Sequence, residues 1–290
     1  MIRCGVAGWD YPDWKGIVYP AAVGRGFDRL AFVARFVDTI EINTSFYRPV
    51  APRVAESWLR RTSDLPAFRF TAKAHRSMTH QPETGPQEAV AQTLPGLKPL
   101  LDAGRLGALL LQFPQSFHFT RTAVERLDRV LPHLEDWPVA VEVRHASWAS
   151  ESAEEWFSAR DIGWCVVDQP RVGEATLDAL PRVTSSLGYV RLHGRNATDW
   201  FRADAGRDAR YDYLYSMSQL RDLVVTLRTM AQTAENLFVV QNNHFRGKAL
   251  VNALQMKDLL LDRKPLAPEE LVAAYPDLES SVRVERSRLF

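Results

Sequence analysis

Acidic and basic side chains recur at two-residue spacing inside short apolar runs of the chain. Glu142 and Arg144 stand in one valine-rich run, and Arg191 and His193 stand in another. Side chains alternate across a strand, so residues two apart share a face and lie about 6–7 Å apart. A carboxylate can act as a general acid or base, and a guanidinium can hold a phosphate or carboxylate by forked hydrogen bonds. This pattern predicts an enzyme that uses acid/base chemistry on a small polar, anionic substrate.

Four residues are predicted as the catalytic groups. Glu142 or Glu41 would be the general acid or base, with His193 assisting. Lys73 would be an ion-pair partner, which is the role we favour, or a Schiff-base nucleophile if neighbouring guanidinium groups depress its pKa. The reaction class stays open between a hydrolase, a lyase and an isomerase.

A second set of side chains is predicted to bind the substrate, because these residues share the inward strand faces or follow the strands. On the eighth strand pattern we favour Gln241 and Asn243 inward, since Phe238 and Val240 would then meet the helices. The predicted substrate-binding residues are Trp9, Asn43, Tyr47, His75, Gln112, Arg144, Asp168, Arg191 and Asn243. The formal charges of the inward set balance, so a neutralised interior of ion pairs is the alternative interpretation.

The elements that would position these groups are eight strand patterns separated by mostly helix-length segments. The strand patterns lie at residues 2–7, 39–43, 68–74, 106–113, 139–145, 163–168, 187–193 and 237–243. Such alternation favours parallel pairing through βαβ units. We therefore predict an α/β fold, a single (β/α)₈ TIM-type barrel that takes up residues 1–290 as one domain. An open doubly wound sheet is the rival fold, and residues 169–186 leave room only for a short sixth helix.

Loop lengths indicate where a site would lie. The strand-to-helix loops at residues 9–26, 75–91 and 194–215 are long. In a barrel these loops open on the face that hosts active sites, so they predict a walled pocket there. Aromatic side chains of the first loop, such as Trp9 and Trp14, would stack on a flat ligand or plug one end of the barrel. Segments starting at Ser152 and Ser216 fit capping boxes and predict helix starts.

Composition limits the range of partners and locations. The 290 residues include 36 Lys and Arg and 35 Asp and Glu, for a formal net charge of +1. This balance does not favour nucleic-acid binding, and no apolar run is long enough for a membrane span. Cys4 and Cys165 lie far apart in apolar runs, which fits buried thiols in a reducing compartment. We expect a cytoplasmic protein with a small-molecule anionic substrate or ligand and no membrane partner; its oligomeric state is left open.

No motif indicates a nicotinamide, flavin or nucleotide cofactor, and no metal ligands are predicted. Two alternative functions remain. One is a divalent-metal-dependent hydrolase or isomerase, or a nuclease, with ligands drawn from Glu142, Asp168, His145 and His193. The other is a non-catalytic ligand-binding or regulatory module, because a barrel does not by itself demonstrate catalysis.

The chain resembles the YecE-like family, also called domain of unknown function 72, in blocks that follow the family's order along nearly its whole length. These blocks read GVAGW from residue 5, WKG from 14, YP from 19, IEINTSFY from 40, FRFTAK from 68, TH from 79, LG from 106, LQFP from 111, AVEVRHASW from 140, VRLHGR from 190, NN from 242 and NA from 252. The resemblance implies a TIM-type barrel and brings no function with it. Gln241 stands where the family usually has phenylalanine.

Overall fold

Eight parallel strands form a closed barrel in the computed structural model, which describes residues 1–171, 176–200, 202, 207–261 and 263–285. The strands are β1 (Ile2–Ala7), β2 (Thr39–Ile42), β3 (Arg69–Lys73), β4 (Leu106–Gln112), β5 (Val139–Glu142), β6 (Gly163–Asp168), β7 (Leu187–Leu192) and β8 (Asn236–Gln241). They neighbour one another in chain order, and β8 pairs with β1 to close the ring. The predicted (β/α)₈ barrel is confirmed, and the open-sheet alternative is wrong.

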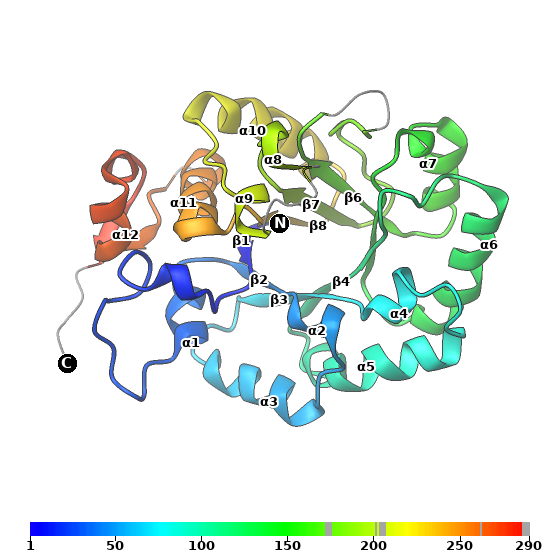
Figure 1. Cartoon of the computed structure of the whole chain (residues 1–290), viewed down its shortest axis with the longest axis horizontal. Coiled ribbons are helices and arrows are strands. Elements are labelled where there is room, and N and C mark those ends of the chain that lie inside the picture. Colours follow the sequence, from blue (N-terminus) through cyan, green and yellow to red (C-terminus); the bar gives the residue numbers. More distant parts are fainter. Residues whose placement is uncertain (172–175, 201, 203–206, 262, 286–290) are drawn as a thin grey trace.

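Helices surround the barrel and connect most successive strands (Figure 1). The α-helices are α1 (Arg29–Ala34), α2 (Thr44–Tyr47), α3 (Pro52–Arg61), α4 (Arg76–Thr79), α5 (Pro86–Asp102), α6 (Arg121–Val130), α7 (Glu151–Ser158), α8 (Ala197–Trp200), α9 (Arg207–Arg210), α10 (Met217–Ala231), α11 (Lys248–Leu261) and α12 (Glu269–Ala274). Short 3₁₀ helices are η1 (Pro12–Trp14), η2 (Leu131–Leu134), η3 (Ala146–Trp148), η5 (Phe245–Gly247) and η6 (Pro276–Ser281). A parallel pair, β9 (Leu266–Pro268) and β10 (Arg283–Glu285), follows the barrel and was not predicted.

Several strands end earlier than the apolar pattern predicts, because polar residues at their ends take part in turns. Asn43 precedes the first turn of α2 instead of extending β2. His145 is the N-cap of η3, where its side chain accepts a hydrogen bond from the Ser147 amide. Between β6 and β7, the described residues 169–171 and 176–186 contain no helix, so the short sixth helix is absent there.

The two predicted helix starts have different outcomes. The capping box of α10 is confirmed, since the Ser216 side chain and the Gln219 side chain bond each other's backbone amides. The capping box at Ser152 is wrong: Ser150 has the extended backbone of an N-cap, and its hydroxyl accepts from the Ala153 amide at 3.2 Å. Ser152 lies inside α7.

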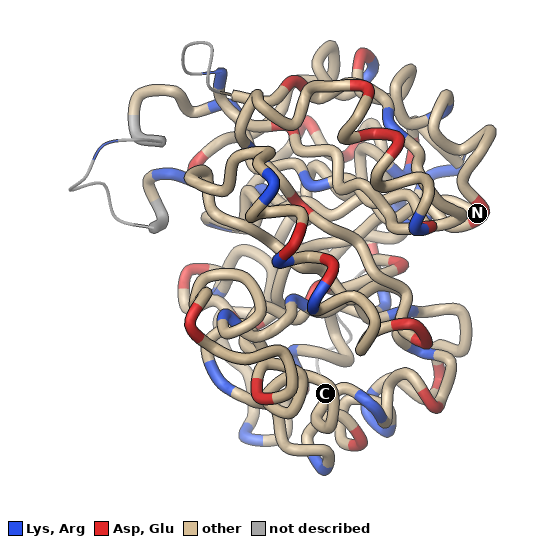
Figure 2. Tube along the Cα trace, turned by 90° about the vertical axis from the view of Figure 1, so that its right-hand side faces the viewer, with Lys and Arg blue, Asp and Glu red and all other residues tan. Residues whose placement is uncertain are grey.

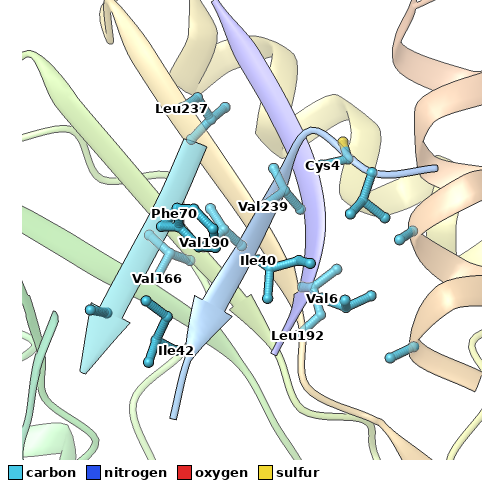
Figure 3. Packing of buried hydrophobic residues seen from close by; sticks show 14 of the residues in the cluster. Cys4, Val6, Ile40, Ile42, Phe70, Val166, Val190, Leu192, Leu237 and Val239 are labelled. Carbon is cyan, nitrogen blue, oxygen red and sulfur yellow. The ribbon is translucent and has the colours of Figure 1, made fainter. Parts of the chain in front are cut away.

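The outward faces of the strands form an apolar layer under the helices. Figure 3 shows members of this layer, including Cys4 and Val6 of β1 and Ile40 and Ile42 of β2. The residues between them in sequence point into the barrel, as alternation requires. The helices therefore cover a continuous hydrophobic surface, which is the main source of stability for such a fold.

An apolar cluster lies inside the barrel, and its packing corrects the predicted orientation of β8. Phe238 and Val240 belong to the inner cluster, together with Tyr189, whose ring stacks on Phe238 with centroids 6.2 Å apart. Gly107 of β4 makes room for this ring, because a Cβ there would lie 2.1 Å from the Phe238 Cζ. Phe238 is thus inside and Gln241 is outside, the reverse of the prediction.

Candidate functional site

Two buried carboxylates and two guanidinium groups form an ion-pair cluster at the carboxyl ends of the strands. Arg191 of β7 donates to Glu41 of β2 through Nε and Nη2, at 3.0 and 2.7 Å. Its Nη1 donates to Glu142 Oε2 at 2.7 Å, and Arg144 Nε donates to the other oxygen, Oε1, at 2.6 Å. Both carboxylates are fully buried. The four charges balance, which fits the ion-pair interpretation of the interior.

The environment of Glu142 keeps its carboxyl group ionised. Burial alone would raise the pKa of Glu142, but the guanidinium groups of Arg144 and Arg191 hold this pKa well below its usual range. Each of its oxygens also accepts a hydrogen bond from one arginine. Glu142 is therefore a negative anchor for the two arginines, and it carries no proton that it could donate near neutral pH.

Tyr189 completes the buried cluster and was missed by the sequence analysis. Its hydroxyl donates to Glu41 Oε2 at 2.9 Å and lies 2.8 Å from Thr71 Oγ1. Tyr189 stands two residues before Arg191 and shares its face of β7. The same alternation that placed Arg191 inward could have placed Tyr189 there, although an aromatic ring in an apolar run gives no signal of a polar role.

Lys73, the last residue of β3, presents a perturbed amine to the same end of the barrel. Its Nζ donates to Gln112 Oε1 at 2.7 Å and lies 4.2 Å from the centre of the Phe46 ring. Burial, reinforced by the positive charge of Arg191, lowers the pKa of Lys73 to about 7. Near neutral pH a large fraction of this amine is therefore uncharged and nucleophilic.

His193 is buried beside the cluster in its neutral form. Burial lowers the pKa of His193 to about 3, although its interaction with Glu142 acts in the opposite direction. Its Nδ1 lies 2.8 Å from Asn242 Nδ2, and its Nε2 lies 3.9 Å from Glu142 Oε1. Arg144 Nη2 and Arg191 Nη1 each lie 3.5 Å from the same Nε2, so the ring contacts both arginines of the cluster as well as Asn242.

A pocket of about 900 Å³ opens above this cluster. Residues at the strand ends form what we term the basic floor: Asn43, Lys73, Gln112, Arg144, Arg191 and Asn242. Residues of the loop after β1 and of the α2–α3 region form the apolar wall: Trp9, Tyr47, Pro49, Val50, Val54 and Trp58. Tyr11, Arg210, Tyr211 and His244 also line the pocket.

The structure brings most of the predicted site residues together at this pocket. Seven of the predicted residues line it, namely Trp9, Asn43, Tyr47, Lys73, Gln112, Arg144 and Arg191. Three more predicted residues are buried next to the pocket. Glu41 bonds Arg191, and Glu142 bonds Arg144. His193 lies 2.8 Å from Asn242. In the first loop, Trp9 lines the pocket, whereas Trp14 is buried and donates its Nε1 to the His244 carbonyl oxygen at 2.8 Å. Trp9 therefore lies where a ligand could contact it, and Trp14 packs in the protein interior.

Besides these three buried residues, three more predicted residues do not line the pocket. His75 caps α4, where its ring nitrogen accepts from the Ser77 amide. Asp168 accepts hydrogen bonds from the Arg195 guanidinium and from the Tyr215 hydroxyl, the latter at 2.5 Å. Asn243 donates to the Tyr213 carbonyl oxygen and to Asn252. Each of these side chains anchors a segment beyond its strand.

Asn242 and Trp58 are pocket residues that the sequence analysis missed. Asn242 was assigned to the wrong face, because β8 was expected to turn Phe238 toward the helices. Its pairing with His193 at 2.8 Å shows the inward orientation. Trp58 lies on α3, and its ring meets Trp9 edge to face with centroids 5.7 Å apart. Only an amphipathic helical pattern marks this position, so no sequence signal assigned it to a site.

The described residues contain neither a metal-ligating cluster nor a membrane-spanning helix. Within the described ranges there is no group of three or more His, Cys, Asp or Glu side chains that could hold a metal ion. Across the same residues, none of the helices combines the length and the apolar character that a bilayer crossing requires. Lysine and arginine are interspersed with aspartate and glutamate along the chain (Figure 2).

These features define a class of protein, a (β/α)₈ barrel with a basic, partly aromatic pocket at the carboxyl ends of its strands. The chain belongs to the family described as "Protein of unknown function DUF72", which it matches over residues 3–274. The family resemblance drawn from the sequence blocks is thereby confirmed.

Relatives and solved structures agree with this assignment. The UPF0759 protein YunF of Bacillus subtilis is 32% identical over 287 residues, which cover 93% of this chain and 99% of that protein. The UPF0759 protein YecE of Escherichia coli K12 is 28% identical over 186 residues, 62% of this chain and 60% of that protein. A DUF72 family protein of Thermotoga maritima superposes with a TM-score of 0.78 at 33% identity, covering 90% of this chain and 99% of that one. A DUF72 family protein of Enterococcus faecalis superposes with a TM-score of 0.79 at 27% identity, covering 90% of this chain and 96% of that one.

Proposed function

We propose that this protein is an enzyme that binds a small anionic substrate on the basic floor and uses the Lys73 amine as its acid/base group. The observation that carries the proposal is a lysine with a pKa of about 7 on the same pocket floor as two arginines. A general base works best when its pKa lies near the operating pH. Whether the reaction is hydrolysis, elimination or isomerisation stays open.

The distribution of charge supports an anionic substrate. Lys73, Arg144 and Arg191 line the pocket, whereas the carboxylates that neutralise the two arginines lie buried beneath them. On the floor itself, a bound molecule therefore meets donors and positive charge, although the Asp10 carboxylate also lines the pocket and pairs with Arg29. Arg144 is the better exposed of the two arginines, with 17% of its side chain accessible against 2% for Arg191. A guanidinium in this position can bind phosphate or carboxylate through two parallel hydrogen bonds.

The proposed roles differ from those predicted from the sequence. Glu142 was expected to be the general acid or base, but both of its oxygens are bonded to arginines and its pKa is lowered. We assign to Glu142 and Glu41 the positioning of Arg191 and Arg144. His193, neutral and fully buried, would fix the Asn242 amide at the floor. Lys73 is left as the floor residue suited to proton transfer or to attack on a carbonyl group.

The proposal can be tested with two variants and one matched control. Ligand-induced thermal shifts across a panel of phosphorylated and carboxylated metabolites should appear in the wild type and vanish in Arg144→Met. They should persist in Arg121→Met, because Arg121 is 93% exposed on α6. Turnover of any compound so identified should fall at least a hundredfold in Lys73→Met, the usual size of an acid/base contribution of about 10²–10⁴. Shifts that survive unchanged in Arg144→Met would refute the anion site, and ligands bound without turnover would favour the non-catalytic alternative.

A further inference from the structure

Two parts of the pocket lining differ in polarity, the basic floor and the apolar wall, while Asp10, Thr44 and Arg48 add polar groups beside the wall. All six floor residues carry amide, ammonium or guanidinium groups, and they come from the carboxyl ends of strands around the barrel. The six wall residues are aromatic or aliphatic, and they come from the loop after β1 and from α2, α3 and the turn between them. A ligand that fills the pocket must therefore contact two chemically distinct surfaces.

The apolar wall combines a fixed base with accessible apolar groups. Trp58 is only 5% exposed and is held edge to face against Trp9. Tyr47 and Val54 also line the pocket, and they are 68% and 38% exposed. Exposed apolar side chains that gather beside a pocket mark a surface that a ligand covers. A small anion bound only to the basic floor would leave the apolar wall exposed to water.

We propose that the substrate is a two-part molecule, an anionic group joined to an aromatic or aliphatic body. The anionic group would sit on the basic floor near Arg144, and the body would lie along Tyr47 and Val54. The volume of about 900 Å³ is far larger than inorganic phosphate needs and suits a ligand with such a body. This inference rests on the proposed anion-binding function and adds the class of substrate to it.

Five probes separate the two halves of the ligand. Phenyl phosphate and 3-phenylpropanoate carry both parts, inorganic phosphate and propanoate carry the anion alone, and 3-phenylpropan-1-ol carries the body alone. By calorimetry on the full chain, each aromatic anion should bind at least tenfold tighter than its non-aromatic counterpart and than the alcohol. The better of the two aromatic anions identifies phosphate or carboxylate as the preferred group.

Variants of the apolar wall test where the aromatic or aliphatic part of the ligand binds. The double substitution Tyr47→Ala and Val54→Ala should weaken binding of the preferred aromatic anion about tenfold and leave its non-aromatic counterpart unchanged, because it removes wall surface and leaves the charged groups of the floor in place. Both positions are exposed, so the fold should tolerate the change. Val225→Ala is the matched control, since Val225 is 68% exposed on α10 and is not among the pocket residues. Val225→Ala should change neither the affinity for the aromatic anion nor the affinity for its non-aromatic counterpart.

The outcomes distinguish this inference from the function on which it rests. Equal binding of aromatic and non-aromatic anions, or undiminished aromatic binding in the double variant, would overturn the two-part substrate and leave the anion site standing. Binding of 3-phenylpropan-1-ol as tight as that of 3-phenylpropanoate would also overturn the two-part substrate. If none of the anions binds, or if binding survives Arg144→Met, the proposed function itself fails.

Discussion

At the scale of single residues, the environment of Lys73 contains opposing influences whose balance decides its chemistry. The Phe46 ring, 4.2 Å from Nζ, favours the charged ammonium by a cation–π contact. Burial and the charge of Arg191 favour the neutral amine, and they prevail, because the pKa of Lys73 is lowered to about 7. The hydrogen bond to Gln112 fixes the direction of the amine. Under the proposed function, the side chain is thereby prepared for proton transfer or nucleophilic attack before the substrate binds.

Lys73 should therefore react with amine reagents at lower pH than an ordinary lysine, whose pKa is about 10.4. The neutral fraction of its amine grows as the pH rises through 7, so acetylation of Lys73 should reach half of its maximal rate near pH 7. Peptide mass spectrometry after brief acetic anhydride pulses between pH 5 and about 10 measures this dependence. In Arg144→Met the midpoint should move upward, because Arg144 contributes to the lowered pKa. A midpoint above pH 9 in the wild type would contradict the assignment.

Gln241 illustrates a polar residue in an unfavourable place. It is fully buried on the outward face of β8, which packs against α10 and α11. Among the described residues, neither its amide oxygen nor its amide nitrogen has a hydrogen-bond partner. Burying an unpaired amide costs about 1–3 kcal/mol by the measure of protein mutations.

Gln241→Met should therefore raise the free energy of unfolding by about 1–3 kcal/mol, because it keeps the side-chain length and removes the unpaired amide. Urea denaturation followed by circular dichroism measures the change. Gln87→Met, at an exposed position of α5, is the control and should leave stability nearly unchanged. Destabilisation by Gln241→Met would indicate that the amide is satisfied by buried water.

At the scale of the elements, strands are predicted better than the residues that begin and end them. The alternation of Glu142 and Arg191 with valines and leucines marked β5 and β7 and turned the correct faces inward. It misoriented β8, where residues 237–240 are apolar on both faces and the polar Gln241 favoured the wrong face. There the space left by Gly107 decides the orientation, and that contact lies across the barrel, beyond any local pattern.

The start of α7 provides a direct comparison between the predicted and the observed cap. Ser150→Ala should lower the free energy of unfolding by about 1 kcal/mol, because the free Ala153 amide loses its acceptor. Ser152→Ala, two residues later and exposed inside the helix, should cost almost nothing, since alanine is a strong helix former. Paired urea titrations measure both variants. An equal loss in both would restore the capping role predicted for Ser152.

At the scale of the whole molecule, the barrel could be predicted from the number and spacing of the strands, whereas the site could be predicted only in part. Alternation assigns a face but does not say whether a side chain at a strand end meets the pocket or a loop. His75 and Asp168 were assigned to the pocket, and instead they bond Ser77 and Arg195. The single-domain organisation and the cytoplasmic location stay predictions.

Packing across the barrel should couple β4 to β8. Gly107→Ala should destabilise the protein by about 1–3 kcal/mol, the usual cost of overpacking, because its Cβ would collide with the Phe238 ring. Combining it with Phe238→Leu should cost less than the sum of the single changes, by at least about 0.5 kcal/mol. A double-mutant cycle of unfolding free energies measures this coupling. Strict additivity would show that the two positions do not meet.

The bonds that join Arg191 to both Glu41 and Glu142 have a consequence for how this fold can diversify. Three strands from different parts of the chain lock the guanidinium in place as soon as the polypeptide folds. Under the proposed function, the site that binds the anionic group is then a property of the barrel, whereas the surface that would select the rest of the ligand is carried by α2, α3 and nearby loops. Exchanging those segments should redirect selectivity toward new molecules without dismantling the anchorage for their charge.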